Sequence, residues 1–283
     1  MPELAEVETW RRLAEKTALG KTITSVETAE DRIVMDQIPP EEIARNLRGR
    51  RILSTHRKGK HMWIRFDQPG DLLLHFGMSG SLNHYRNPAV APTHEKLVLV
   101  LDDGSRLSYR NPRRIGKIRW HEDARLAPPI AALGPDPFLD TISADDLAQQ
   151  FVRRKRPIKS ALLDQSLFAG VGNWIADEVL YQSKIDPHTP CGELGPAQLR
   201  SLTAKLHAII QKAVEVEADE TRFPKTWLFH HRWGKQAEYT ARGERICFET
   251  IGGRTCAWVP ERQKKTPPTR RTEELMESNS NST

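Results

Sequence analysis

The apolar positions at the start of the chain recur at helical spacing, and they are Val7, Trp10, Leu13 and Ala14. After Gly20 the period changes, and short β-prone runs follow one another, separated by turn residues such as Asp103-Gly104, which are typical of a tight hairpin. The runs read ITSVE, RILSTH, HMWIRF, DLLLHF, KLVLVL and RLSYR. Six or more short strands after a single helix predict a β-sandwich or barrel.

The second half of the chain is mainly helical in pattern. The stretch 121–143 is rich in Pro and lacks periodicity, so it is interpreted as a linker. Ser143 and Asp146 form a capping-box pattern that predicts a helix through Arg154. Further helical patterns cover 158–164, 173–184 and 196–216, and the runs ERICFET and RTCAWVP around Gly252-Gly253 predict a terminal hairpin.

Composition narrows the class of protein. A chain of 283 residues with 38% hydrophobic and 28% charged residues suits a globular protein of two compact units. The net charge of +6 permits a polyanionic partner without requiring one. We expect no membrane span and no secretory signal, and a cytoplasmic location, nucleoid-associated in a bacterium. Three widely spaced cysteines form no disulfide framework and favour a reducing compartment.

The opening MPELAEVET has two interpretations. Pro2 at the first turn of a helix is common, and a helix start alone explains the stretch. Alternatively, removal of Met1 exposes the secondary amine of Pro2, a nucleophile able to attack a sugar C1′ and form an iminium. Glu3 and Glu6 would then act as proton donors or acceptors beside that amine.

Two features of the second half suggest phosphate binding. In GVGNWIADEVL, Gly170 and Gly172 precede a helix that begins at Asn173, an arrangement that favours an anion but also occurs at a simple helix–turn–helix joint. Upstream, RRKRPIK holds five basic residues, which are Arg153, Arg154, Lys155, Arg156 and Lys159. A solvated helix end would explain the basic run, but next to the anion-binding turn it favours a surface that follows phosphates.

Two turns of the first half could enter a base stack. HFGMSGSL places Met78 on one turn, and YRNPRRIG places Arg113, Arg114 and Ile115 on another. A loop Met usually packs internally, but a Met and an Arg exposed together could fill the space left by a flipped nucleotide. Lys60, in RKGKHMWI, is unremarkable on its own.

In chain order these motifs, with LGPDP and the closing GGRT and Gln263, resemble the formamidopyrimidine-DNA glycosylase and endonuclease VIII family, and the opening resembles its formamidopyrimidine branch. The resemblance implies an α+β fold with an N-terminal β-sandwich at 1–125 and a linker at 126–143. It further implies a helix–two-turns–helix domain at 144–226 and a β-hairpin finger at 227–265. The tail at 266–283 is polar and low in hydrophobic residues, so we predict that it is disordered. The implied protein is a monomer without cofactor that binds double-stranded DNA containing oxidised bases or abasic sites.

The resemblance also implies residue roles. Pro2 would be the nucleophile, Glu3 would handle protons at the sugar, and Lys60 would lie near the lesion phosphate. Further DNA and substrate contacts would come from Glu6, Met78, Arg113, Arg114, Ile115, Lys155, Asn173 and Arg254. Glu178 would be a structural acid behind the phosphate contacts. The implied activity is removal of oxidised bases and cleavage of the abasic strand by β/δ-elimination.

The sequence departs from the family pattern in the opening, in one turn and in the finger. Ala5 replaces a proline, and Ile115 replaces a Phe, so weak discrimination of the opposite base is expected. KQAEYTARG and VPERQ stand where the finger usually carries paired cysteines, and Cys247 and Cys256 lack ligand spacing, so we predict a finger without zinc. The predicted packing residues of that finger are Phe229, Trp233, Phe248 and Trp258.

The length of one segment suggests which damaged bases the protein prefers. Only ten residues, EADETRFPKT, separate the helix ending near Val216 from a predicted strand near Trp227, where family members that process 8-oxoguanine well carry a longer loop. We therefore expect a preference for ring-opened formamidopyrimidines and hydantoins over 8-oxoguanine. A non-catalytic DNA binder is the alternative, although the intact Pro2-Glu3 opening argues against it. An RNA-binding module fits poorly because no aromatic stacking platform lies on a strand pattern.

Overall fold

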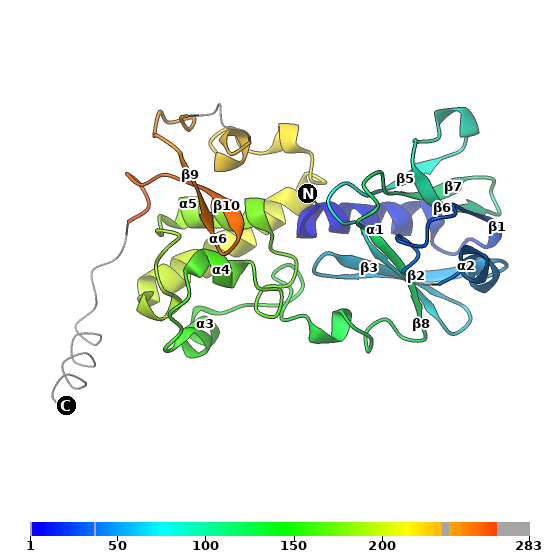
Figure 1. The fold of residues 1–283 in the computed structure, drawn as a ribbon, viewed down its shortest axis with the longest axis horizontal. Helices are drawn as coiled ribbons and strands as arrows, with labels where there is room; N and C mark the ends of the chain where they lie inside the picture. The colour runs from blue at the N-terminus through cyan, green and yellow to red at the C-terminus, as the bar shows by residue number, and fades with distance from the viewer. Residues whose placement is uncertain (1, 37, 234–237, 265–283) are drawn as a thin grey trace. The chain divides into compact units, whose positions relative to one another are not determined.

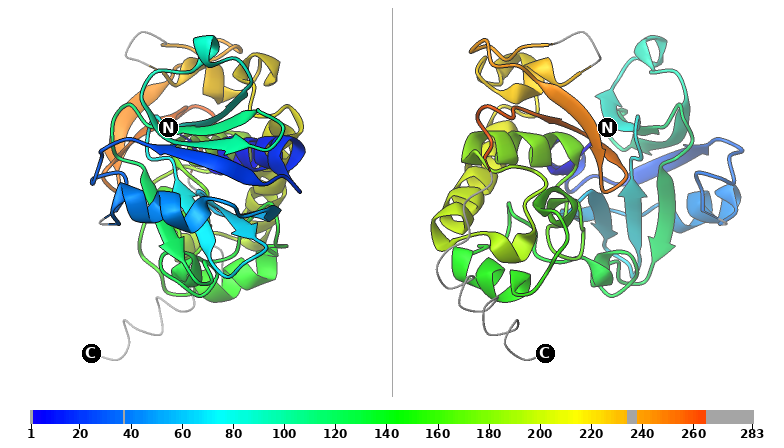
Figure 2. Two further views of the ribbon diagram at one scale, coloured as in Figure 1. Left: turned by 90° about the vertical axis from the view of Figure 1, so that its right-hand side faces the viewer. Right: turned by 60° about the vertical axis from the view of Figure 1, so that its left-hand side comes forward.

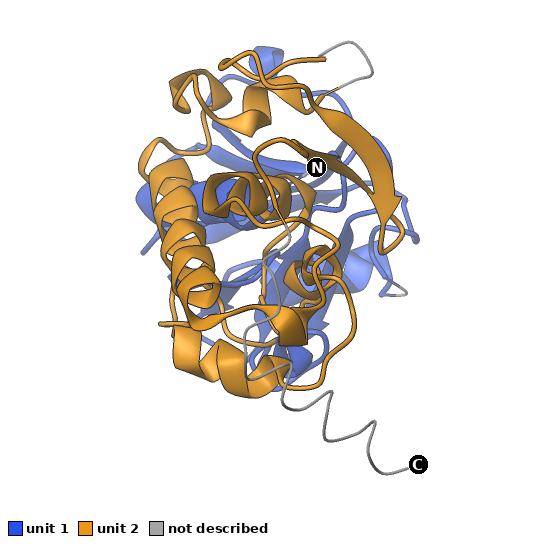
Figure 3. Cartoon of the chain, turned by 90° about the vertical axis from the view of Figure 1, so that its left-hand side faces the viewer, with its two compact units in different colours: residues 1–133 blue, residues 134–283 orange. Residues whose placement is uncertain are grey.

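The computed structural model describes residues 2–36, 38–233 and 238–264, and the chain divides into two compact units, 1–133 and 134–283 (Figure 3). The division falls inside the segment 126–143 that the sequence predicts as a linker. The predicted tail, 266–283, lies outside the described residues. Among the described helices, none combines the length and the apolar character needed to cross a membrane.

Unit 1 holds two four-stranded antiparallel sheets, with strand orders β1-β6-β7-β5 and β2-β3-β4-β8 (Figure 1). The strands are β1 (Ile23–Thr28), β2 (Ile52–Lys58), β3 (His61–Phe66), β4 (Asp71–His75), β5 (Ser81–Tyr85), β6 (Glu95–Leu101), β7 (Arg106–Arg110) and β8 (Lys117–His121). Its helices are α1 (Leu4–Ala18) and α2 (Pro40–Leu47), with short 3₁₀ turns η1 (Pro88–Val90) and η2 (Ile130–Ala132). The six predicted runs are all strands, and the predicted sandwich is confirmed. The sequence analysis missed α2, β5 and β8.

The core of unit 1 explains where α1 sits. Side chains alternate along the strands, so that Met62, Ile64, Leu72 and Leu74 share one core with residues of the other sheet. α1 contacts β2 and β3 of one sheet and β5 and β7 of the other. Its Trp10 lies 4.3 Å from the ring of Phe76. The start of the chain is therefore fixed against both sheets of its own unit.

Unit 2 is helical and ends in a two-stranded hairpin (Figure 2). Its helices are α3 (Ala144–Phe151), α4 (Ile158–Leu162), α5 (Asn173–Ser183) and α6 (Pro196–Glu215), and the hairpin strands are β9 (Cys247–Ile251) and β10 (Arg254–Trp258). The 3₁₀ turns are η3 (Cys191–Glu193), η4 (Glu220–Arg222) and η5 (Leu228–His231). The Ser143 capping box is present, but α3 ends at Phe151 instead of Arg154, because Arg153 adopts a left-handed conformation with φ +59°. The strand predicted near Trp227 is instead the turn η5.

The packing of the hairpin differs in part from the prediction. Phe248 is 37% exposed, so the prediction that it packs the finger is wrong. Trp233 is 51% exposed, but its ring packs edge-to-face on Phe229 at 5.3 Å, as predicted. Phe229 is buried among aromatic rings, and Trp258 packs edge-to-face on His188 at 5.2 Å. The apolar contacts of the hairpin come from a separate cluster, which consists of Tyr181, Leu228, Ile246, Ala257 and Val259.

Candidate functional site

The first turn of α1 places two acids directly after Pro2. Glu3 caps the helix and is buried, and its backbone N–H donates to Oε2 of Glu6 at 3.0 Å, which is one half of a capping box. Burial, and then the nearby charge of Glu3, raise the pKa of Glu6 to about 7. The helix start therefore has the capping role expected of any helix and also presents an acid that exchanges its proton near neutral pH.

Lys60 lies in the turn between β2 and β3, after Gly59 at φ +59°. Burial, and then the positive charge of Lys60, lower the pKa of His75 on β4 to about 4. Burial is also the main reason that the pKa of His61 falls to about 3, and the two imidazole rings stack at 4.6 Å. Both rings are therefore neutral at neutral pH, and His75 lies close enough to Lys60 for its charge to affect the pKa of the ring. The sequence analysis did not single out His75, although it ends a predicted strand.

The turn that carries Met78 and the turn that carries Arg113, Arg114 and Ile115, both predicted to enter a base stack, lie against each other in unit 1. A Cβ on Gly77, which has φ +63°, would stand 2.7 Å from the backbone of Ile115 and 2.7 Å from that of Gly116. Asn111 donates from its side chain to the carbonyl of Phe76 at 3.0 Å, which ties the turns together. Met78 and Ile115 are 41% and 43% exposed. The structure thus places two exposed apolar side chains on adjoining turns.

The two arginines of the second turn differ in their surroundings. Arg114 has φ +57° and forms a forked pair with the buried carboxylate of Asp31, with N–O distances of 2.9 and 3.1 Å, so it holds the turn in place. Arg113 is exposed and forms no salt bridge with the residues that the structure describes. His94, also exposed, accepts the N–H of Asn111 with its carbonyl at 3.1 Å at the base of this turn.

In unit 2, the predicted phosphate contacts Asn173 and Arg254 are joined through the hairpin. Asn173 begins α5, and its Nδ2 donates to the carbonyl of Thr255, the residue after Arg254, at 2.8 Å. Gly252, at the hairpin turn with φ +59°, lies so close to Ser160 of α4 that a Cβ would overlap the hydroxyl. The hairpin turn therefore rests on the starts of α4 and α5, with Arg254 exposed beside it.

The basic run at 153–159 is only partly exposed, so the prediction that all five of its basic residues form a phosphate-binding surface is corrected. Lys159 is completely buried, and its ammonium binds the carboxylate of Asp177 and, at 3.0 Å, the carbonyl of Asn173. Arg156 pairs with Asp164 at 2.8 Å. Lys155 is exposed and stays a candidate for phosphate contact.

Glu178 is a buried structural acid in α5. It accepts the backbone N–H of Phe229 at 2.9 Å and the side-chain amide of Gln182 at 2.8 Å. Burial raises its pKa to about 7. Glu178 therefore links α5 to η5 from within the unit.

The hairpin does not fit a zinc site of the family type. Cys256 is buried on β10 and pairs in register with Glu249, while Cys247 pairs with Trp258, so only two sulfurs are available. Burial raises the pKa of the Cys256 thiol, which opposes the thiolate that zinc requires. Among the described residues, no group of three or more His, Cys, Asp or Glu side chains is arranged to hold a metal ion.

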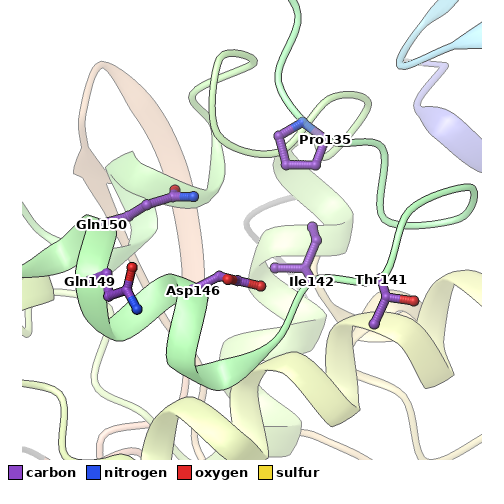
Figure 4. A pocket seen from close by; sticks show the side chains of 6 residues that line it. All are labelled: Pro135, Thr141, Ile142, Asp146, Gln149 and Gln150. Carbon is purple, nitrogen blue, oxygen red and sulfur yellow. The ribbon is translucent and has the colours of Figure 1, made fainter.

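Two pockets flank these regions, one in each unit. In unit 1, a pocket of about 590 Å³ is lined by His61 and His75 together with Lys117 and Arg119 of β8. Both cations pair with Asp36, Lys117 at 3.3 Å. The pocket of unit 2, about 280 Å³, lies beside α3 and is lined by Pro135, Thr141, Ile142, Asp146, Gln149 and Gln150 (Figure 4). None of the predicted site residues lines it, and its acid, Asp146, is engaged in the capping box.

The fold belongs to the predicted α+β class, with an antiparallel sandwich behind a leading helix, then helices, then a terminal hairpin. The family model for the formamidopyrimidine-DNA glycosylase N-terminal domain matches residues 1–118, and the model for the H2TH domain of the same enzymes matches residues 133–225. The chain therefore belongs to the formamidopyrimidine-DNA glycosylase family.

Individual relatives agree with this assignment. The chain is 40% identical over 277 residues to a formamidopyrimidine-DNA glycosylase of Arabidopsis thaliana, covering 93% of this chain and 71% of the relative. It is 33% identical over 283 residues to one of Neisseria meningitidis, covering 93% and 100%. A solved complex of a Lactococcus lactis Fpg mutant with DNA containing Fapy-dG is similar with TM-score 0.82 and 28% identity, over 93% of this chain and 100% of that one. Another Lactococcus lactis complex, with DNA containing an AP site, has TM-score 0.81, 27% identity and the same coverage.

Proposed function

We propose that this protein is a bifunctional DNA glycosylase and AP lyase of base-excision repair, acting as a monomer on double-stranded DNA that contains oxidised bases or abasic sites. The observation that supports it most is the start of α1, where Pro2 directly precedes the buried acid Glu3 and, one turn on, the half-buried acid Glu6. Burial raises the pKa of Glu6 to about 7, which suits an acid that exchanges protons during catalysis. Solved relatives that carry DNA with Fapy-dG or an AP site support the choice of substrate class.

The chemistry begins once Met1 is removed. The secondary amine of Pro2 attacks C1′ of the damaged nucleotide, a C1′–N bond to Pro2 forms, and the bond from C1′ to the base breaks as the base takes up a proton. Glu3 exchanges protons at the sugar, which opens to leave an iminium on C1′. Loss of a C2′ proton then breaks the C3′–O3′ bond, and a second elimination breaks the C5′–O5′ bond. Lys60 lies near the lesion phosphate and stabilises its charge.

Contacts to the DNA come from both units. Met78, Arg113 and Ile115 are exposed on turns suited to filling the space of a flipped nucleotide. Lys155, Asn173 and Arg254 supply phosphate contacts in unit 2, and Arg114 serves mainly to hold its turn.

Borohydride trapping tests the activity directly. Borohydride reduces the iminium to a stable amine, so a covalent protein–DNA adduct should form on duplexes with an abasic site or a formamidopyrimidine. Mass spectrometry should locate the adduct on a peptide that begins with Pro2. An uncleaved N-terminal extension should abolish the adduct, and Pro2→Gly should diminish it. Tight binding to the same duplexes without any adduct would instead establish the non-catalytic binder. Undiminished trapping by Pro2→Gly would refute Pro2 as the nucleophile.

The segment EADETRFPKT supports a proposal about the lesion. It contains the turn η4, and its Phe223 is buried against the rings of Trp174, Trp227 and Phe229 at 5.6, 5.0 and 4.9 Å. A short segment that its Phe223 holds against the rings of neighbouring elements offers few backbone donors to read a base edge. We infer a preference for formamidopyrimidines and hydantoins, which are extruded at lower cost, over 8-oxoguanine.

Single-turnover excision rates on matched duplexes test this preference. Formamidopyrimidine opposite cytosine should be excised faster than 8-oxoguanine opposite cytosine, and changing the opposite base should have little effect because Ile115 offers no ring for stacking. Equal rates for the two lesions would contradict the proposal, while leaving the glycosylase activity itself established.

A further inference from the structure

A buried ion pair joins α1 to β2 in unit 1. Oε2 of Glu8 lies 3.0 Å from Nε of Arg57, and the two side chains are only 4% and 0% exposed. Arg11 and Arg12 also reach this carboxylate, each at 2.9 Å. Although burial favours the neutral acid, Arg11 and Arg57 hold the pKa of Glu8 below its usual range. The carboxylate is therefore ionised at neutral pH and anchors Arg57.

Arg57 continues from this pair to the turn that carries Lys60. Its Nη1 donates to the carbonyl oxygen of Gly59 at 3.0 Å. That oxygen belongs to the planar peptide group that joins Gly59 to Lys60. Because one guanidinium binds both the carboxylate and this peptide group, it fixes the plane from which Lys60 projects.

The same helix begins with the acids next to Pro2. A helix rises about 1.5 Å per residue, so Glu8 lies roughly 7 to 8 Å along the axis from the cap residue Glu3. A rigid path thus runs from the chain start through Glu8 and Arg57 to Lys60. We propose that Glu8 and Arg57 are positioning residues that hold the ammonium of Lys60 at a set place relative to the N-terminal amine. This inference rests on the proposed function.

A double-mutant cycle separates positioning from general stabilisation. Arg57→Lys keeps a charge for Glu8, but one ammonium lacks the fork that spans Glu8 and the carbonyl of Gly59. The single-turnover trapping rate should fall about 10-fold, as expected for a misplaced catalytic group, with affinity for an uncleavable abasic analogue changed less than about twofold. When Lys60 is already replaced by Ala, Arg57→Lys should lower the trapping rate by less than about twofold, because no ammonium remains to be misplaced.

Two further variants complete the experiment. Arg65→Lys is the matched control, since Arg65 of β3 makes a forked pair with Asp71 at 3.1 and 3.0 Å in the same sheet, and its trapping rate should match the wild type. If Arg57→Lys folds poorly, Glu8→Gln repeats the cycle with the anchor charge removed. If the wild-type protein traps DNA but the rate losses of Arg57→Lys and Lys60→Ala multiply in the double variant, the two residues act independently. That result would overturn the positioning role and leave the proposed function intact. A wild-type protein that forms no adduct would overturn the proposed function instead.

Discussion

Replacement of Asp177 should destabilise unit 2 more than any comparable single change of charge there. The Asp177 carboxylate is completely buried in α5 and binds the ammonium of Lys159. It also accepts two nitrogens of Arg232, at 3.1 and 2.6 Å, and the backbone N–H of Ala257 on β10 at 3.2 Å. One carboxylate therefore pairs with two buried cations and joins α4, the end of η5 and the hairpin.

The size of the effect follows from what Asp177→Asn leaves behind. The amide has nearly the same shape, so packing is kept, but Lys159 and Arg232 lose their counter-charge inside the protein. Breaking a buried pair by removing one partner costs about 3 to 5 kcal/mol. Without the charge of Asp177, and with Arg232 nearby, the pKa of Glu178 should fall from about 7, so Glu178 would release its proton to solvent more readily and its carboxylate would return part of that cost. We expect a net loss of about 3 kcal/mol in the free energy of unfolding of unit 2.

The assay must report on this unit. Urea unfolding of the full chain gives the free energy of unfolding, and hydrogen exchange at the amide of Ala257 gives the local stability where the hairpin is attached. Asp164→Asn is the matched control, because it makes the same chemical change at a half-exposed pair with Arg156, and it should cost no more than about 1 kcal/mol. If Asp177→Asn unfolds and exchanges like this control, the buried charges do not hold the hairpin.

The remaining predictions concern metal, phosphate contacts and pH. Purified protein should contain well under one zinc per chain and keep its activity with a chelator; stoichiometric zinc would show that the finger has been misread. Arg254→Ala should weaken binding to all lesions and reduce the salt dependence by about one ion, as measured by DNA titrations at several salt concentrations. An unchanged salt slope would argue against a phosphate contact by Arg254. Glu178 has a raised pKa, so ionising it costs the folded state stability progressively from the ordinary pKa of 4.5 up to about 7. Relative to wild type, Glu178→Gln should therefore gain about 3 kcal/mol between pH 4 and pH 8 in urea unfolding, and a constant difference would refute the raised pKa.

Periodicity predicted most of the elements because most of them bury a regular face. β3 and β4 are buried at nearly consecutive positions, because successive side chains face opposite sides of the sheet and both sides are covered: Ile64 and Leu72 belong to one apolar cluster, and Leu73 to another. β5 and β8 were missed because each carries only one or two fully buried side chains among polar ones. Their strand conformation is set by pairing with β7 and β4, which are distant in sequence.

The site residues were predicted from sequence motifs. These predictions were wrong where the burial of a side chain depends on a partner that is distant in the sequence. In the sequence Lys159 looks like one more residue of an exposed basic run. In the structure its ammonium is buried in an ion pair with Asp177, eighteen positions later. Phe248 is apolar in the sequence, yet it lies on β9 of a two-stranded hairpin, one face of which is open, and the residue type alone does not reveal this. His75 was overlooked, although the register that pairs it with His61 places it beside the turn of Lys60.

The contacts between the hairpin and the helices of unit 2 determine how Arg254 is held in place. If the finger carries no zinc, as predicted, these contacts must take over the role that a metal would have within the hairpin. Asn173 binds the carbonyl of Thr255, Gly252 rests on Ser160, and Asp177 binds the N–H of Ala257. Each of these contacts reaches α4 or α5, so the position of Arg254 depends on the helices that also present Asn173. Loss of the buried charges should therefore displace both proposed phosphate contacts together.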